Sequence, residues 1–283
     1  QAVSDFCQCH FSKKPTQICK PGKHLYDSQW FIDAELNFAQ NLLSRNDEHP
    51  AILFASEDGR RSMLTYKQLY KKVHVLADFF RQAGIQPGDR IAAFLPNLPE
   101  TVIAMLATTS IGAIWSSCSS DFGIEGLLSR FKQIEPRLLI AVDGHFYNGK
   151  THNHLDKIKR LQQEISSIEQ TLLIPYLQHE PDIESLKNTT LFSSIPNEPN
   201  TDQLQFESLP FDHPVTILYS SGTTGKPKCM VHGAGGTLIQ HKKELLLHTD
   251  LHENDRLLFI TTCGWMMWNW LISGISTGAK IVQ

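Results

Sequence analysis

A dense group of small hydroxyl, glycine and lysine residues lies in the stretch YSSGTTGKPK, residues 219–228. The glycines let backbone N–H groups approach an anion without a Cβ in the way, and the hydroxyls can donate further hydrogen bonds. The two lysines supply positive charge, and Pro227 restricts the backbone between them. We therefore predict a phosphate-binding loop whose contacts come from Ser220, Ser221, Gly222, Thr223, Thr224, Gly225, Lys226 and Lys228.

This loop differs from the phosphate loop of nucleoside triphosphatases. That motif has the spacing G-x-x-x-x-G-K-[ST] and opens a helix, whereas the glycines here lie closer together and Pro227 follows Lys226. An ordinary turn between strands would explain the glycines, but it would not explain four hydroxyls and two lysines. The pattern favours phosphate binding of another type.

A second unusual stretch is TTCGWMMWNWL, residues 261–271, which holds three of the five tryptophans within six positions. So much aromatic surface is uncommon outside a core or a binding site. Trp268 and Trp270 are equally well explained as core residues. Met266 and Met267 are unbranched and flexible, so they suit the wall of an irregular pocket.

The rest of the sequence predicts how these stretches are positioned. Short apolar runs alternate with helical patterns, which is typical of an α/β fold with doubly wound, mainly parallel sheets. We expect a helix through residue 80, a second helix that a proline opens at residue 99, and a third around residue 131. Residues 178–214 are expected to form a surface connection, and a glycine turn at 233–236 is expected to precede another helix. Strands are expected at 51–54, 90–95, 113–118, 138–142, 215–219, 229–232, 257–261 and 279–283.

The loop with its flanking strands resembles the phosphate-binding signature of the adenylate-forming superfamily, which includes acyl-CoA synthetases, luciferases and peptide-synthetase adenylation domains. In that family the loop wraps the β- and γ-phosphates of ATP while a substrate carboxylate attacks the α-phosphorus. The resemblance implies catalytic roles for Lys226, Thr223 and Thr224, because preorganised donors and positive charge stabilise the departing pyrophosphate.

Other stretches resemble the acyl-CoA synthetase branch, and within it the enzymes that activate acetoacetate. These are WSSCSSDFG (115–123), HFYNGKTHNHL (145–155), MVHGAGGTLIQHKKELLLH (230–248) and CGWMMWNW (263–270). Related enzymes carry Gly-Trp at the mouth of the acyl pocket, which implies a catalytic position for Trp265 and a pocket formed by Trp265, Met266 and Met267.

The resemblance implies ATP-dependent ligation of acetoacetate to coenzyme A through acetoacetyl-adenylate, with AMP and pyrophosphate as products and Mg²⁺ on the pyrophosphate. The magnesium ligand is expected beyond residue 283. In related enzymes coenzyme A docks near the segment that corresponds to residues 119–121, but this chain has Ser120 and Asp121 where acetyl-CoA synthetases carry glycines. Lys150 is the candidate contact for coenzyme A. Two alternatives stay open: a ligase for another short-chain acid, and a non-catalytic nucleotide-binding relic.

The resemblance also predicts how the chain is divided. We expect an N-terminal cap over residues 1–50 and the large AMP-binding domain over residues 51–283. The sequence ends in an apolar strand without a following turn, so we expect this domain to be incomplete and the small C-terminal domain to be absent. A chain of this extent is not expected to complete catalysis alone.

Composition excludes several classes of protein. With 41% hydrophobic residues, 19% charged residues and a formal net charge of -3, the chain fits neither a disordered protein nor a nucleic-acid binder. It lacks the apolar run of a membrane span, so we expect a cytoplasmic protein with small-molecule partners.

We interpret the six cysteines as reduced thiols, with Cys118, Cys229 and Cys263 in core strands. Cys7, Cys9 and His10 are of the types that ligate metals, but loosely packed N-terminal residues are the preferred interpretation.

Overall fold

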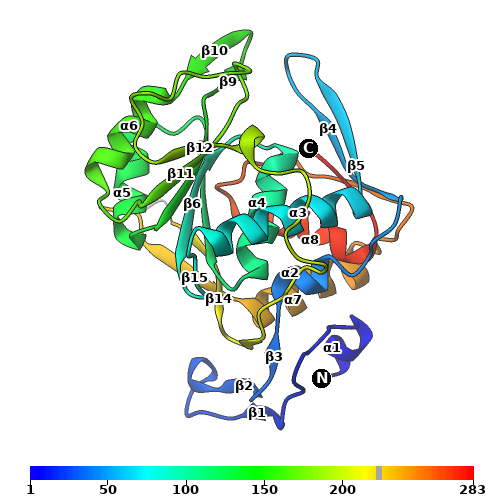
Figure 1. The fold of residues 1–283 in the computed structure, drawn as a ribbon. Coiled ribbons are helices and arrows are strands. Elements are labelled where there is room, and N and C mark those ends of the chain that lie inside the picture. Colours follow the sequence, from blue (N-terminus) through cyan, green and yellow to red (C-terminus); the bar gives the residue numbers. More distant parts are fainter. Residues whose placement is uncertain (221–224) are drawn as a thin grey trace.

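The fold is built on a seven-stranded sheet with the order β12-β11-β8-β6-β7-β14-β15 (Figure 1). The computed structural model describes residues 1–220 and 225–283. All neighbouring strands are parallel except the last pair, β14 and β15. The predicted doubly wound, mainly parallel sheet is therefore confirmed. Its strands are β6 (Arg90–Leu95), β7 (Ile114–Ser119), β8 (Leu138–Val142), β11 (Gln170–Ile174), β12 (Thr189–Leu191), β14 (Pro214–Tyr219) and β15 (Cys229–Gly233).

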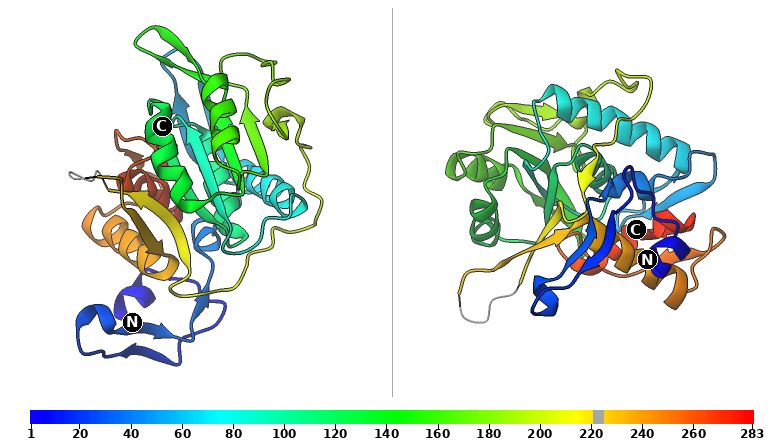
Figure 2. Two further views of the ribbon diagram at one scale, coloured as in Figure 1. Left: turned by 90° about the vertical axis from the view of Figure 1, so that its left-hand side faces the viewer. Right: turned by 90° about the horizontal axis from the view of Figure 1, so that it is seen from below.

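Helices cover both faces of this sheet (Figures 1 and 2). Alternate residues of β6 belong to different cores: Ile91 packs with α3 (Tyr66–Gln82) and α4 (Pro99–Ser110), whereas Ala92 packs with α5 (Ile124–Ile134) and α6 (Leu155–Glu164). The period of two along a strand produces this division. The sequence also determines where these helices start, because Thr65 and Gln68 form a reciprocal capping box before α3 and a proline opens α4.

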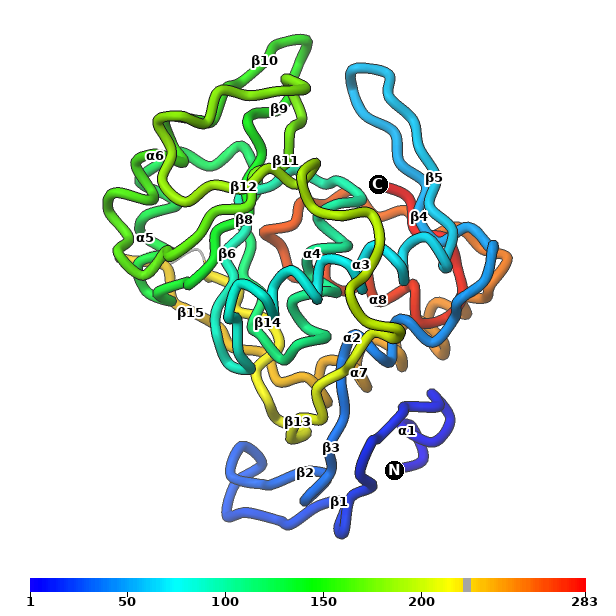
Figure 3. Tube along the Cα trace, in the orientation of Figure 1, coloured from blue at the N-terminus to red at the C-terminus, as the bar shows by residue number. Residues whose placement is uncertain are grey.

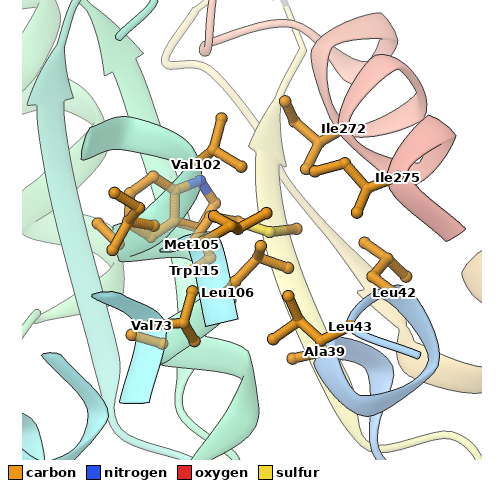
Figure 4. Packing of buried hydrophobic residues seen from close by; sticks show 14 of the residues in the cluster. Ala39, Leu42, Leu43, Val73, Val102, Met105, Leu106, Trp115, Ile272 and Ile275 are labelled. Atoms are coloured by element: carbon orange, nitrogen blue, oxygen red, sulfur yellow. The ribbon is translucent and has the colours of Figure 1, made fainter. Parts of the chain in front are cut away.

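A second, four-stranded sheet has the order β16-β17-β4-β5. Its strands are β16 (Arg256–Leu258), β17 (Lys280–Val282), β4 (Pro50–Ala55) and β5 (Arg61–Thr65), and only the β4–β5 pair is antiparallel. Ile52, Leu257 and Ile281 of this sheet belong to the same buried cluster as Trp115 of the large sheet. In Figure 4, Trp115 and side chains of α4 lie near α2 (Phe38–Leu42) and the segment that carries Ile272 and Ile275. One core therefore joins the two sheets.

The N-terminal elements lie beside this body (Figures 1 and 3). They are α1 (Ala2–Phe6), β1 (Gln17–Lys20), the 3₁₀ turn η1 (Leu25–Asp27), β2 (Gln29–Ile32) and β3 (Glu35–Leu36), which pairs with β13 (Leu209–Pro210). Cys7 is 1% exposed, and the Phe31 ring stacks on Phe211 at 4.5 Å. The expectation of loosely packed N-terminal residues is wrong, because aromatic contacts hold them to the segment before β14.

Several elements differ from the predictions. Gly235 and Gly236 lie inside α7 (Ala234–Lys243) instead of a turn, and η3 (Glu244–His248) continues that helix with π-helical geometry. The strand expected to reach residue 261 ends at Leu258. The connection over 178–214 contains β12, the 3₁₀ turn η2 (Phe192–Ser194) and β13. The prediction of three cysteines in core strands is correct only for Cys118: Cys229 lies in β15 but is exposed, and Cys263 is buried in a turn.

The sequence patterns did not predict four further features: β5, α6, β11 and the hairpin of β9 (Gly144–Tyr147) and β10 (Lys150–Asn153). No helix within residues 1–220 and 225–283 has both the length and the apolar character needed to cross a lipid bilayer.

Candidate functional site

The carboxyl ends of β6, β7 and β14 lie at one edge of the large sheet because these three neighbouring strands are parallel. The chain passes from β6 to β7 on one side and then returns to β8 on the other side of β6. In doubly wound sheets, ligands bind outside the carboxyl ends of the strands near such a reversal. Topology alone therefore indicates a binding site at this edge.

The predicted phosphate-binding loop starts at this edge, between the antiparallel strands β14 and β15. The Ser220 backbone N–H donates to the Lys228 carbonyl at 3.0 Å and closes the base of the loop. Gly225, Lys226 and Lys228 are exposed, and neither lysine forms an ion pair with a described residue. The remaining predicted contacts, Ser221, Gly222, Thr223 and Thr224, lie outside the described residues.

Two side chains that the sequence analysis missed hold the flanks of the loop. Gln133 of α5 donates from Nε2 to the Pro227 carbonyl at 2.9 Å. Ser116 of β7 hydrogen-bonds the Tyr219 hydroxyl at 2.9 Å, and burial raises the pKa of Tyr219, so this phenol stays neutral. Gln133 and Ser116 lie far from the loop in the sequence, so no local pattern could have revealed them.

The tryptophan-rich stretch crosses the same edge. Ser117 of β7 donates to the Cys263 carbonyl at 2.5 Å, and the Cys263 thiol donates to the carbonyl of Leu95, the last residue of β6, at 3.0 Å. A Cβ added to Gly264 would lie 3.4 Å from the backbone nitrogen of Ser119, at the end of β7. Residues 263 and 264 are therefore attached directly to the ends of the central strands.

This attachment places the start of α8 (Met266–Ser273) at the site, with Trp265 as its N-cap residue. Trp265 is 68% exposed and Met266 is 48% exposed, whereas Met267 is partly buried. Trp268 is fully buried and donates from Nε1 to Asn97 Oδ1 at 2.7 Å. The core interpretation is therefore correct for Trp268, while Trp265 and Met266 present apolar surface outside the core.

Lys150 lies apart from these contacts. It is exposed in β10, in a hairpin that projects at one end of the molecule (Figures 1 and 2). Residues 1–220 and 225–283 contain no cluster of three or more histidine, cysteine, aspartate or glutamate side chains that could hold a metal ion. Cys7, Cys9 and His10 are therefore not gathered into such a cluster, and burial raises the pKa of Cys9 to about 11.

The model of the AMP-binding enzyme family matches residues 39–283. The chain belongs to this family. It is 46% identical to the acetoacetyl-CoA synthetase of Gallus gallus over 90% of the chain and 39% of that relative. It is 40% identical to the malonamoyl-CoA synthetase of Penicillium aethiopicum over 98% of the chain and 40% of that relative.

A solved structure of acetoacetyl-CoA synthetase from Streptomyces lividans matches with a TM-score of 0.91 and 39% identity, over 99% of the chain and 43% of that structure. The resemblance to the acyl-CoA synthetase branch of the adenylate-forming enzymes is thereby confirmed, as is the fold of their N-terminal domain. The chain spans about two fifths of the length of the curated relatives it matches.

Proposed function

We propose that this chain forms the adenylation part of a ligase that joins acetoacetate to coenzyme A at the expense of ATP, through acetoacetyl-adenylate. The observation that carries the proposal is the 46% identity to acetoacetyl-CoA synthetase over 90% of the chain. The geometry adds support, because the loop after β14 and the segment before α8 are both anchored at the carboxyl edge of the sheet.

In the proposed first step, an acetoacetate oxygen attacks the α-phosphorus of ATP and pyrophosphate leaves. Negative charge then grows on the departing β- and γ-phosphates, where preorganised N–H and hydroxyl donors stabilise it. Lys226 and Lys228 are free to pair with these phosphates, since both are exposed and form no ion pair with a described residue. Ser220, Gly225 and residues 221–224 complete the proposed set of donors.

The acid would be held beside Trp265, Met266 and Met267. The hydrogen bonds of Cys263 attach the turn before Trp265 to β6 and β7. They hold the backbone at Trp265 in place, although the indole ring is exposed. The two methionines can adapt to a short chain that carries a second carbonyl group. Trp265 would exclude water from the reacting carboxylate.

In the second step the coenzyme A thiol attacks the acyl carbon, and AMP leaves. Lys150 is the proposed contact for a coenzyme A phosphate, supported by its exposed position. Mg²⁺ would supply charge to the pyrophosphate, but the described residues form no multi-ligand cluster that fits such an ion. We therefore assign no residue to Mg²⁺. The predicted boundary at residue 50 and the cytoplasmic location stay predictions.

A second acid deserves comparison because of the malonamoyl-CoA synthetase relative. Malonamate and acetoacetate both carry a carbonyl group β to the carboxylate, and they differ only in an amide replacing a methyl ketone. A pocket that selects only for the chain length of the acid and for its β-carbonyl group would accept both acids. A pocket that hydrogen-bonds the amide group would discriminate between malonamate and acetoacetate, because polar groups left without a hydrogen-bond partner are costly.

ATP–pyrophosphate exchange tests the proposal on the protein expressed from its whole reading frame. Acetoacetate, malonamate, butyrate and acetate are compared by the rate at which labelled pyrophosphate enters ATP. We expect the highest kcat/KM with acetoacetate. A preference for malonamate would establish the second candidate, and exchange with none of the four acids would contradict adenylate formation from short acids.

A further inference from the structure

A polar pocket is lined by residues of the segment after α1, of helix α2 and of helix α7. Its volume is about 420 Å³, and its wall includes Gln8, His10, Gln40, Tyr70, Ser276 and Lys242. None of its lining residues is an aspartate or a glutamate. None of its lining residues belongs to the phosphate-binding loop or to residues 261–271, so this pocket is separate from the site described above.

Lys242 is the unusual residue of this pocket. It is only 6% exposed, yet among the described residues no group accepts a hydrogen bond from its Nζ and no carboxylate pairs with it. Its Nζ is not among the fully enclosed polar atoms that lack a partner, so it can be reached from the pocket, and burial of the side chain lowers the pKa of Lys242. A buried lysine of this kind ordinarily has a counter-charge.

The nearby thiols do not supply that counter-charge. Cys9 and Cys7 could offset the charge of Lys242 only as thiolates. Burial raises the pKa of both thiols, that of Cys9 to about 11. Both thiols are therefore protonated and neutral near pH 7. The neighbouring Lys243 shows the contrast, because its Nζ pairs with Glu244 at 2.9 Å.

We propose that this pocket binds a small oxyanion, the phosphate or carboxylate group of a metabolite, paired with Lys242. The amides of Gln8 and Gln40 and the hydroxyls of Tyr70 and Ser276 line the same space and can donate hydrogen bonds to such a group. A pocket of about 420 Å³ has room for more than a bare phosphate ion, so the anion would be one end of a larger molecule.

Thermal unfolding with inorganic phosphate or sodium acetate tests this site at constant ionic strength. A ligand that binds only the folded state raises Tm, and we expect a rise of at least about 2 °C for the unmodified protein with one of the two anions. In a Lys226→Ala background, which lacks the proposed phosphate contact of the loop, Lys242→Gln should remove this rise and weaken binding measured by calorimetry at least about tenfold. A rise with phosphate alone identifies a phosphoryl ligand, and a rise with acetate alone identifies a carboxylate.

Two controls locate the effect. Lys243→Gln removes the adjacent, paired lysine of the same helix and should keep the full response. The Lys226→Ala background shows any contribution of the phosphate-binding loop, and the response assigned to this pocket should persist in it. In that background, an anion response that survives Lys242→Gln, or the absence of any response while Lys242 is present, would overturn the proposal.

A second variant covers the case in which Lys242→Gln does not fold. Gln40→Glu places a carboxylate in the wall of the same pocket and leaves Lys242 in place. This built-in counter-charge should raise Tm without added anion and abolish the response to phosphate or acetate. An unchanged response in Gln40→Glu would contradict the assignment.

Discussion

At the residue scale, the Ser117 hydroxyl connects the core to the candidate acid site. It accepts a hydrogen bond from Trp115 Nε1 at 3.0 Å and donates one to the Cys263 carbonyl at 2.5 Å. Both contacts are buried, and a buried donor that loses its partner costs about 1 to 3 kcal/mol. The position of Trp265 therefore depends on a serine in the central sheet.

Ser117→Ala should lower the free energy of unfolding by about 1 to 3 kcal/mol and raise the KM for the acid more than the KM for ATP. Urea denaturation and steady-state kinetics measure these effects. Ser129→Ala is a suitable control, because that hydroxyl bonds only within α5. Equal changes in both KM values would contradict a specific role in placing the acid site.

Lys226→Ala tests the proposed contact with the β- and γ-phosphates. We expect the affinity for ATP to fall about tenfold or more while the affinity for AMP changes little, because AMP lacks those phosphates. Calorimetric titration of both nucleotides measures the difference. A comparable loss for ATP and AMP would place Lys226 elsewhere in the site.

Sequence reasoning at this scale rests on local chemistry, and its phosphate-binding residues stay predictions. Four hydroxyls, two glycines and two lysines within one loop indicated phosphate binding without any structure. It failed for Cys229, because an alternating strand at the edge of a sheet can expose a residue that the apolar pattern suggests is buried. Ser116, Ser117 and Gln133 gave no signal, since their partners come from distant segments.

At the scale of elements, α7 shows how packing overrides propensity. Glycine disfavours helix, which is why residues 233–236 were predicted to form a turn. A Cβ on Gly235 would lie 2.2 Å from the Phe211 ring, which stacks on Phe31. The missing side chain is what lets the helix approach that aromatic pair. Such a constraint becomes visible only when the neighbouring segment is in place.

Gly235→Ala should therefore destabilise the protein by about 1 to 3 kcal/mol, because the Phe211 ring must move. Gly236→Ala is the matched control in the same turn of α7. Nothing lies within 4 Å of its added Cβ, and alanine loses less backbone entropy than glycine on folding, so this change should stabilise by roughly 0.5 to 1 kcal/mol. Urea denaturation distinguishes the two, and equal effects would refute the packing argument.

Among the described residues, helix α5 is hydrogen-bonded to the loop after β14 by the exposed Gln133 side chain, which donates to the Pro227 carbonyl. Gln133→Ala should raise the KM for ATP about two- to fivefold, since a weaker hold on the loop costs ordering entropy. Tm should stay nearly unchanged. Lys132→Ala removes a neighbouring side chain that pairs with Glu164 instead, and its KM should match that of the unmodified protein.

The elements that sequence reasoning predicted best are the strands of the parallel sheet. Buried on both faces, β6 and β8 appear as continuous apolar runs bounded by turn residues. The hairpin β9–β10 was missed because β10 is fully exposed and has no apolar pattern. Helix α6 was missed because few of its residues are apolar, although Ile158 and Leu161 reach the core.

At the scale of the whole molecule, buried histidines make stability depend on pH. Burial lowers the pKa of His241 to about 4 and that of His154 to about 3, below the ordinary value near 6.5. Below that ordinary value the unfolded chain binds protons that the folded chain does not. The stabilisation is complete above about pH 6.5 and decreases as the pH falls toward the folded pKa values.

His241→Gln should reduce the loss of stability at low pH, because glutamine does not titrate. We expect the free energy of unfolding of the unmodified protein to fall more than that of the variant between pH 7 and pH 5, by roughly 1 to 2 kcal/mol. Urea denaturation at both pH values measures it. His179→Gln is the control, since the His179 side chain is 97% exposed. Parallel pH profiles for His241→Gln and the unmodified protein would contradict this account.

The pairing of β17 with β4 places Ile281 beside Ile52, although the two residues are far apart in the sequence. A hairpin such as β4–β5 is marginally stable by itself in water. During synthesis this hairpin therefore lacks its third strand until residues 280–282 have been made. Until then the edge of β4 that pairs with β17 is open, and an open strand edge is a site where nascent chains can associate wrongly and where a chaperone can act.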